Sequence, residues 1–217
     1  MKLRSIALLA GLAVLGSAQA ASVILYDNLD PGGYIPTNGW TIATVQSLGL
    51  MFTPSVTATL SQLHLTLSSF EPVQGSQNVP LYDIQLVDSV PSDPNFNTLP
   101  FLPGSNVLAS WSDVAGAGLN VLTPSASVQL AAGTSYWVIV SPGTSYSGPG
   151  GLWLFNANGK LGDLASNFGS VWFDDDSSVA GGMRVVGETS VPVPEPATLA
   201  LAGLGLGLAA RRRARRV

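Results

Sequence analysis

The chain has 217 residues, a formal net charge of −4 and a hydrophobic content of 46%, with no cysteine and a single histidine. The lack of cysteine excludes disulfide bonds and thiolate metal sites, and one histidine argues against the common zinc sites. Between Ala21 and Val191 only two residues are basic, Lys160 and Arg184, against twelve acidic residues, so this segment has a net charge of −10. Such a segment repels nucleic acid, which needs a basic footprint, and leaves cations and neutral polymers as partners.

The first 20 residues contain the three parts of a secretory signal peptide in the expected order. Lys2 and Arg4 precede an apolar run from Ile6 to Gly16, and Ala18-Gln19-Ala20 supplies the small residues of a cleavage site. We predict export, with signal peptidase as a partner that cleaves after Ala20. The alternative is a buried N-terminal helix.

The segment from Ala21 to Val191 is long enough for one well-cored domain. Runs rich in Val, Leu, Thr, Trp and Tyr alternate there with clusters of turn-forming residues, which is typical of short strands. The predicted strands are Val23–Tyr26, Trp40–Val45, Leu48–Phe52, Leu63–Leu67, Tyr82–Val87, Val107–Trp111, Ser127–Leu130, Ser135–Val140, Leu152–Phe155, Val171–Asp174 and Met183–Val186. They predict an all-β fold, a single antiparallel β-sandwich of jelly-roll type.

The pattern within these runs also predicts their place in a sheet. Leu63, Leu65 and Leu67 alternate with polar residues, so this strand has one buried face. Residues 136–140 are apolar on both faces, which predicts the centre of a sheet. Ser89 to Ser105, with four prolines, and Ser141 to Gly151, rich in Gly, Ser and Pro, are predicted to be long loops.

The run from Val128 to Val138, which reads VQLAAGTSYWV and follows the two alternating runs, resembles the choice-of-anchor domains of bacterial surface proteins. The resemblance covers most of Val23 to Val186. It implies a β-sandwich and no established activity.

The residues that could carry catalysis are few. His64 is the sole histidine, and its leucine neighbours predict a solvated position on a strand. No Gly-x-Ser-x-Gly elbow is present. The acidic residues could form a glycosidase pair, but the sequence selects none. We therefore predict a protein that is not an enzyme and has no cofactor, with calcium as the one ion to consider.

Asp174, Asp175 and Asp176 form the densest anionic run and are the predicted calcium ligands. The EF-hand pattern does not fit them, and the alternative is a solvated strand end. Asp27, Asn28 and Asp30 precede Pro31-Gly32-Gly33 and predict an Asx-rich turn rather than a metal site.

Five tryptophans could pack in the core or stack on sugar rings. Most are expected in the core, where large aromatic side chains dominate packing. Trp153, beside a Gly-rich loop, and Trp172, beside the aspartate run, are the predicted sugar contacts.

The segment from Pro192 to Val217 combines a Pro-Glu-Pro motif, an apolar run and a basic end. The apolar run from Ala197 to Ala210 would span about 21 Å as a helix, which is short for a bilayer unless the membrane thins or the flanking arginines snorkel. Five arginines predict a cytoplasmic end for this helix and an exported body; they are Arg211, Arg212, Arg213, Arg215 and Arg216.

Val193, Pro194, Glu195 and Pro196, followed by the apolar run and the arginines, resemble the PEP-CTERM sorting signal. The resemblance implies that a membrane-embedded exosortase recognises the motif and processes the chain near it. An uncleaved tail anchor is the alternative.

Taken together, these patterns predict three parts: a signal peptide (1–20), a β-sandwich domain (21–191) and a sorting signal with a transmembrane helix (192–217). The leading hypothesis is a non-enzymatic protein that is anchored transiently in the inner membrane and then reaches the cell surface or the extracellular polysaccharide matrix. A carbohydrate-binding or adhesive module is the alternative, and an ice-binding protein or an enzyme is less favoured.

Overall fold

The computed structural model describes residues 20–69, 79–144, 150–169, 171–175 and 178–189. These residues form fifteen strands and no helix, and none of them belongs to a helix that could cross a membrane. The prediction of an all-β, antiparallel fold is confirmed. The predicted cleavage region up to Gln19, the C-terminal helix and the arginine-rich end lie outside the described residues.

Seven strands form the first sheet, in the order β1, β15, β4, β10 and β2, with β7 and β8 also paired to β4. The long β4 pairs with β15 and β10 along one edge and with β8 and β7 along the other. Their bounds are β1 (Ala21–Asp27), β2 (Tyr34–Ile42), β4 (Ala58–Ser69), β7 (Ala117–Leu122), β8 (Gln129–Leu130), β10 (Gly151–Asn156) and β15 (Met183–Thr189).

Six strands form the second sheet, in the order β13, β12, β3, β9, β5 and β6. Their bounds are β3 (Ser47–Phe52), β5 (Leu81–Pro91), β6 (Phe101–Ala115), β9 (Tyr136–Pro142), β12 (Leu164–Asn167) and β13 (Trp172–Asp174). A separate two-stranded pair consists of β11 (Leu161–Gly162) and β14 (Ser178–Val179).

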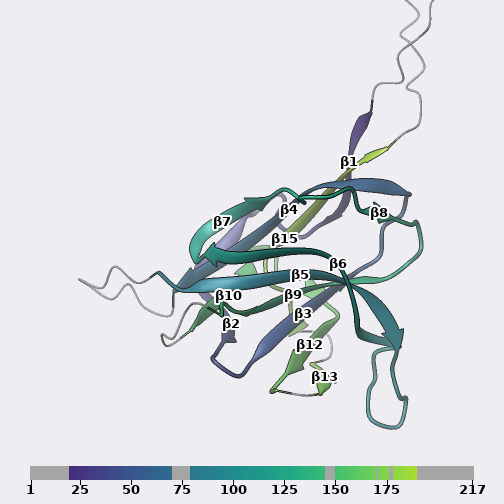
Figure 1. Cartoon of the computed structure of the whole chain (residues 1–217). Coiled ribbons are helices and arrows are strands. Elements are labelled where there is room, and N and C mark those ends of the chain that lie inside the picture. The colour runs from purple at the N-terminus through teal and green to yellow at the C-terminus, as the bar shows by residue number, and fades with distance from the viewer. Residues whose placement is uncertain (1–19, 70–78, 145–149, 170, 176–177, 190–217) are drawn as a thin grey trace, which may run out of the picture. The chain divides into compact units, whose positions relative to one another are not determined.

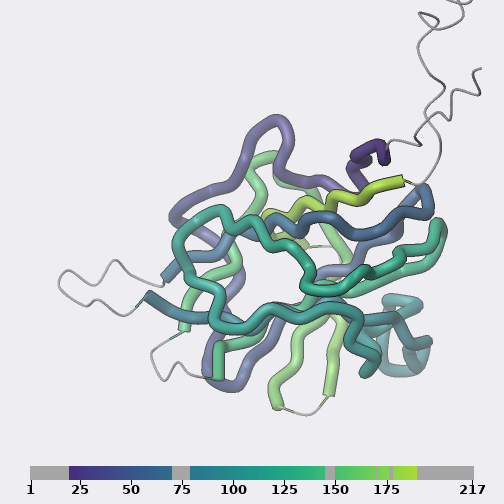
Figure 2. Tube along the Cα trace, turned by 45° about the horizontal axis from the view of Figure 1, so that its top comes forward, coloured from purple at the N-terminus to yellow at the C-terminus, as the bar shows by residue number. Residues whose placement is uncertain are grey.

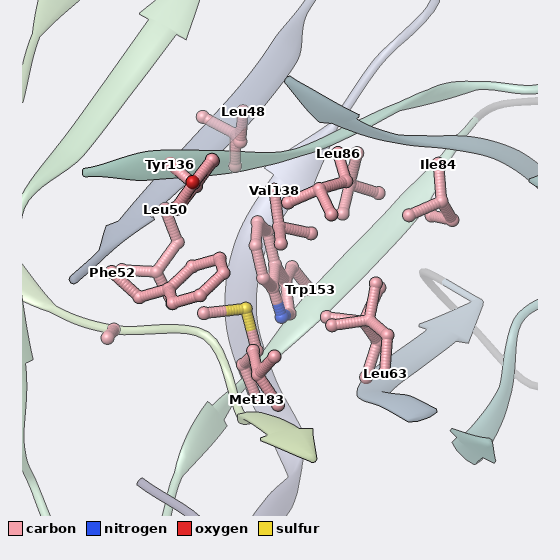
Figure 3. Packing of buried hydrophobic residues seen from close by; sticks show 14 of the residues in the cluster. Leu48, Leu50, Phe52, Leu63, Ile84, Leu86, Tyr136, Val138, Trp153 and Met183 are labelled. Carbon is pink, nitrogen blue, oxygen red and sulfur yellow. The ribbon is translucent and has the colours of Figure 1, made fainter. Parts of the chain in front are cut away.

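The two sheets share one main hydrophobic cluster, as expected for a sandwich. Leu63, Leu65 and Leu67 on β4 are buried, which confirms the alternation read from the sequence. Figure 3 shows Leu63, Trp153 and Met183 of the first sheet facing side chains from β3, β5 and β9 of the second. Jelly-roll connectivity stays a prediction.

The second sheet is buried on both faces along β9. Val138 and Val140 belong to the main cluster, whereas Trp137 and Ile139 belong to a second cluster on the other face. Leu99, from the segment that connects β5 to β6, is buried in the same second cluster. The position of β9 between β3 and β5 confirms the prediction of a central strand.

The first and last strands of the domain are neighbours. β1 pairs with β15, and Figures 1 and 2 show the purple start of β1 beside the yellow end of β15. Asn28 N, just after β1, donates to Met183 O at the start of β15 at 3.1 Å. The two ends of the described chain therefore leave the first sheet side by side.

The prediction of a long loop from Ser89 to Ser105 is wrong at both ends. β5 continues to Pro91 and β6 begins at Phe101, so only residues 92–100 lie outside the strands. The strands β5 and β6 form a hairpin, and β9 pairs with β5 only as far as Asp88. Beyond Asp88 the hairpin is not paired with β9, so prolines can be accommodated in this part of its strands.

Four short strands were not predicted, namely β7, β11, β12 and β14. β7 contains Gly118, which has a φ of 92°, and β12 ends in Ser166 and Asn167. These residue types indicate turns when a sequence is read locally. Pairing with β4 and β3 overrides that preference.

Candidate functional site

Trp153 on β10 lies at the centre of the main cluster and is 0% exposed. Its indole Nε1 donates a hydrogen bond to Gly182 O at 3.2 Å. A Cβ atom on Gly181 would lie 2.4 Å from Trp153 Cδ1, so the ring packs directly on glycine backbone. The prediction of Trp153 as a sugar contact is wrong, because a fully buried ring offers no face to a sugar.

The remaining tryptophans largely support the expectation of core packing. Trp137 is 0% exposed, and Trp40 and Trp111 are half-buried with their Nε1 atoms donating to Val179 O and Thr123 O, both at 2.8 Å. Trp172 on β13 is half-buried against the second cluster. Sugar contact through Trp172 stays a prediction.

Asp174 fastens the β5–β6 connection to β13. Its Oδ2 accepts hydrogen bonds from Thr98 Oγ1 at 2.6 Å, from Leu99 N at 3.1 Å and from Thr98 N. These bonds, the one from the Thr98 side chain foremost, lower the pKa of the Asp174 carboxyl because they favour its charged form. Within the connection, Asp93 Oδ1 accepts from Asn95 N at 2.9 Å. Asp174 is therefore a structural clamp between segments that are distant in sequence.

We expect Asp174→Ala to lower the free energy of unfolding by about 1–2 kcal/mol at neutral pH, because backbone donors of the connection lose their acceptor. The unfolded pKa of an aspartate is about 3.9 and the folded pKa is lower, so this stabilisation exists above pH 4 and disappears as the pH falls through the folded value. Urea denaturation of the full-length chain at neutral and acidic pH measures it. Asp175→Ala is the matched control, and an equal loss in both variants would contradict the clamp.

Calcium binding by Asp174, Asp175 and Asp176 stays a prediction. Asp174 already uses one carboxylate oxygen for the clamp, and Asp176 lies outside the described residues. Among the residues that the structure describes, no group of three His, Asp or Glu side chains is arranged to hold a metal ion.

The turn that follows β1 confirms the Asx-rich prediction. Asp27 Oδ1 accepts hydrogen bonds from Leu29 N at 2.8 Å and Asp30 N at 3.3 Å. Asn158, from the connection after β10, donates through Nδ2 to Asn28 O at 3.1 Å and Asp30 O at 3.0 Å. The turn is therefore fixed both by its own carboxylate and by a distant amide.

Both basic side chains of the domain bind this same turn. Arg184 Nη2 lies 2.7 Å from Asp27 Oδ2, and Lys160 Nζ donates to Asp27 O at 3.0 Å. Both positively charged side chains of the segment from residue 21 to residue 191 therefore bind at one turn.

The Asp27–Arg184 ion pair stays charged over a wide pH range. Burial alone would raise the pKa of the Asp27 carboxyl, but the hydrogen bonds from Arg184 and Leu29 outweigh it and hold that pKa below its usual value. The hydrogen bond to Asp27 raises the pKa of Arg184. Beside the pair, burial raises the pKa of the Tyr26 phenol to about 12.

His64 lies on the face of β4 that points away from the main cluster and is half-buried. Its Nε2 lies 3.0 Å from Gln62 Oε1, and its register partners are Arg184 on β15 and Val121 on β7. Burial and the charge of Arg184 lower the pKa of His64, so the ring is neutral at physiological pH.

Sequence reasoning missed a network of buried polar side chains around residues 180–183, which we call the Ala180–Met183 crossing. Asn156 Nδ2 donates to Ala180 O at 2.8 Å, Asn28 Nδ2 to Gly181 O at 2.8 Å and Thr66 Oγ1 to Gly182 O at 3.2 Å. Asn28 Oδ1 also accepts from Met183 N at 2.7 Å. The consecutive glycines Gly181 and Gly182 were the available signal, since a Cβ on either would clash with Trp153 or Thr66.

The most exposed large hydrophobic side chains of the described residues are not tryptophans. Phe96 is 82% exposed in the connection that Asp174 clamps, and Phe168 and Phe173 are more than half exposed near β12 and β13. None of these phenylalanines was singled out from the sequence.

Residues 192–214 match the family model of the PEP-CTERM protein-sorting motif. The chain carries a PEP-CTERM sorting motif. The match includes Val193, Pro194, Glu195 and Pro196 and three of the five arginines, which confirms the resemblance read from the sequence. No curated protein and no solved structure matches the chain, and no match supports the resemblance to choice-of-anchor domains.

The PEP-CTERM motif implies recognition by an exosortase-type processing enzyme and indicates an exported protein that is processed at the membrane. The matched residues, and Arg215 and Arg216 beyond them, lie outside the described part of the structure. The role of the motif in recognition and that of Arg211, Arg212, Arg213, Arg215 and Arg216 in membrane orientation therefore stay predictions.

Proposed function

We propose that this protein is a non-enzymatic component of the cell surface or extracellular matrix, delivered by export and by PEP-CTERM sorting. The observation that carries the proposal is the motif match at residues 192–214, next to an acidic β-domain. Proteins with this signal are typically the cargo of the sorting enzyme. The motif therefore accounts for where the domain goes, and the domain acts at the destination.

The polar side chains that form hydrogen bonds within the domain support the proposal of a non-enzymatic protein, because they stabilise the fold. Asp174 clamps a connection, Asp27 pairs with Arg184, and Asn28 and Asn156 brace the Ala180–Met183 crossing. Each of these groups satisfies backbone or opposite charge within the fold. These residues contribute to the stability of a domain that is exposed outside the cell without disulfide bonds.

The partner that we propose is a neutral or cationic extracellular polymer. The domain has a net charge of −10, and both of its cations are bound at the Asp27 turn, so anionic polymers are repelled. The alternative is a carbohydrate-binding module. Because Trp153 is buried, the half-buried Trp172 is the remaining predicted sugar contact.

Replacing Glu195 tests the sorting step. We expect Glu195→Ala to abolish C-terminal processing, so that the exported chain keeps the tail and stays with the membrane. The intact mass and the cell fraction of the protein are compared in cells with and without an exosortase.

Glu188→Ala is the matched control, because it removes a nearby exposed carboxylate that lies on β15 outside the matched motif. We expect this variant to be processed like the wild type. Retention of the full tail in wild-type protein from both kinds of cell would overturn the sorting proposal.

A further inference from the structure

The chain contains two Asn-Gly pairs, Asn38-Gly39 and Asn158-Gly159. In such a pair the backbone nitrogen of glycine can attack the side-chain amide carbon of asparagine. The absence of a Cβ atom on glycine leaves this approach unhindered and gives the backbone the freedom to reach it. The two pairs have the same local chemistry, so the fold decides which of them reacts.

Asn38 lies in an exposed and irregular part of β2. The register between β2 and β10 jumps from Gly39 opposite Leu154 to Tyr34 opposite Asn156, so residues 35–38 bulge out of the ladder. All four of these residues are exposed. The local backbone is therefore not confined by regular pairing with a neighbouring strand.

The side chain of Asn38 is already turned toward the attacking atom. Gly39 N donates to Asn38 Oδ1 at 3.0 Å, and the carbon that would be attacked is bonded directly to this oxygen. This hydrogen bond keeps the side-chain amide of Asn38 beside the backbone nitrogen that would attack it.

Asn158 is held in the opposite manner. Its Oδ1 accepts from Gly32 N at 3.1 Å, and its Nδ2 donates to Asn28 O and Asp30 O. The nitrogen that would have to leave is therefore bound by two carbonyl groups of the turn after β1. Attack by Gly159 would require all three hydrogen bonds to break first.

We propose that Asn38 is a site of spontaneous deamidation and that the fold protects Asn158. Gly39 N forms a bond to Asn38 Cγ and loses its proton to water, while the bond from Cγ to Nδ2 breaks and ammonia leaves. The cyclic imide is then opened by water to aspartate or isoaspartate. One water is consumed and one ammonia is released for each residue, with no oxidation or reduction.

The modification adds a negative charge to a domain that is already anionic. The isoaspartate product also lengthens the backbone by one carbon beside Gly39, where the packing is tight, since a Cβ atom there would lie 2.3 Å from Trp153 O. The exported protein is thus converted with age to a more acidic form with a disturbed β2.

Peptide mapping by mass spectrometry of the full-length chain, incubated at mildly alkaline pH, tests the proposal. We expect deamidation at Asn38 to be at least about tenfold faster than at Asn158, because three hydrogen bonds protect the latter. In concentrated denaturant the two rates should converge. Asn38→Gln should abolish the modification at residue 38 and leave the rate at Asn158 unchanged.

Equal rates in the folded protein, or a faster rate at Asn158, would overturn the proposal. A rate difference that persists unchanged in denaturant would also overturn it, because the fold would then not be its cause.

Discussion

Trp153→Ala is expected to lower the free energy of unfolding by about 3–5 kcal/mol, a large fraction of the roughly 5–15 kcal/mol by which most domains are stable. The change removes a fully buried ring from the centre of the main cluster, where Met183 and Leu63 surround it (Figure 3). It also leaves Gly182 O with one donor fewer. The neighbouring glycines have no side chains that could fill the space.

Trp172→Ala is the matched control because it removes the same atoms from a half-buried position in the second cluster. We expect roughly half the loss. Denaturant titrations followed by far-ultraviolet circular dichroism compare the variants without depending on tryptophan emission. A smaller loss for Trp153→Ala than for Trp172→Ala would contradict the assignment of Trp153 to the core.

Asn28→Ala is the second large expected effect, a loss of about 2–4 kcal/mol. Asn28 is 1% exposed and supplies both a donor to Gly181 O and an acceptor for Met183 N. Alanine satisfies neither group, and both are buried at the Ala180–Met183 crossing. The cost is therefore that of two unpaired backbone groups rather than of one average hydrogen bond.

Asn28→Asp tests the same site through its pH dependence. The carboxylate can still accept from Met183 N, but it has no proton to donate to Gly181 O and is buried beside Asp27. Burial and the nearby negative charge raise its folded pKa above the unfolded value of about 3.9. The protonated form can donate, so the contribution of residue 28 to stability is fully present below about pH 4 and is lost as the pH rises through the folded pKa.

The comparison of the two Asn28 variants is decisive. We expect the deficit of Asn28→Asp relative to wild type to shrink on acidification, whereas that of Asn28→Ala stays nearly constant. Parallel pH profiles of the two variants would show that the donor function of Asn28 is not what stabilises the crossing.

Much of the fold could be predicted from local patterns. Alternation placed Leu63, Leu65 and Leu67 on a buried face, and the doubly apolar run placed β9 at the centre of its sheet. The Asx-rich turn after β1 was predicted because aspartate bonds its own following backbone. Each of these features depends on residues that are close together in the sequence.

The candidate site residues were harder to predict because their environments come from distant segments. Trp153 is buried because Gly181 and Gly182 lie against it, and Asp174 is a clamp because Thr98 lies beside it. The sequence shows that Gly181 and Gly182 are consecutive, but it does not show which distant side chain packs against them. The Gly-rich loop beside Trp153 suggested that the side chain is exposed. That loop is a local feature and carries no information about the distant segments that cover the ring.

The place of β15 between β1 and β4 determines how the domain responds to mechanical force. A pull on the chain beyond Thr189, directed along the strand, loads the backbone hydrogen bonds on both sides of β15 together, in shear. On the β4 side, the pairing extends from Met183 to Glu188. A strand at the edge of a sheet, pulled sideways, would lose its bonds one after another. The strand that leads toward the sorting motif is thus hydrogen-bonded to neighbouring strands on both sides.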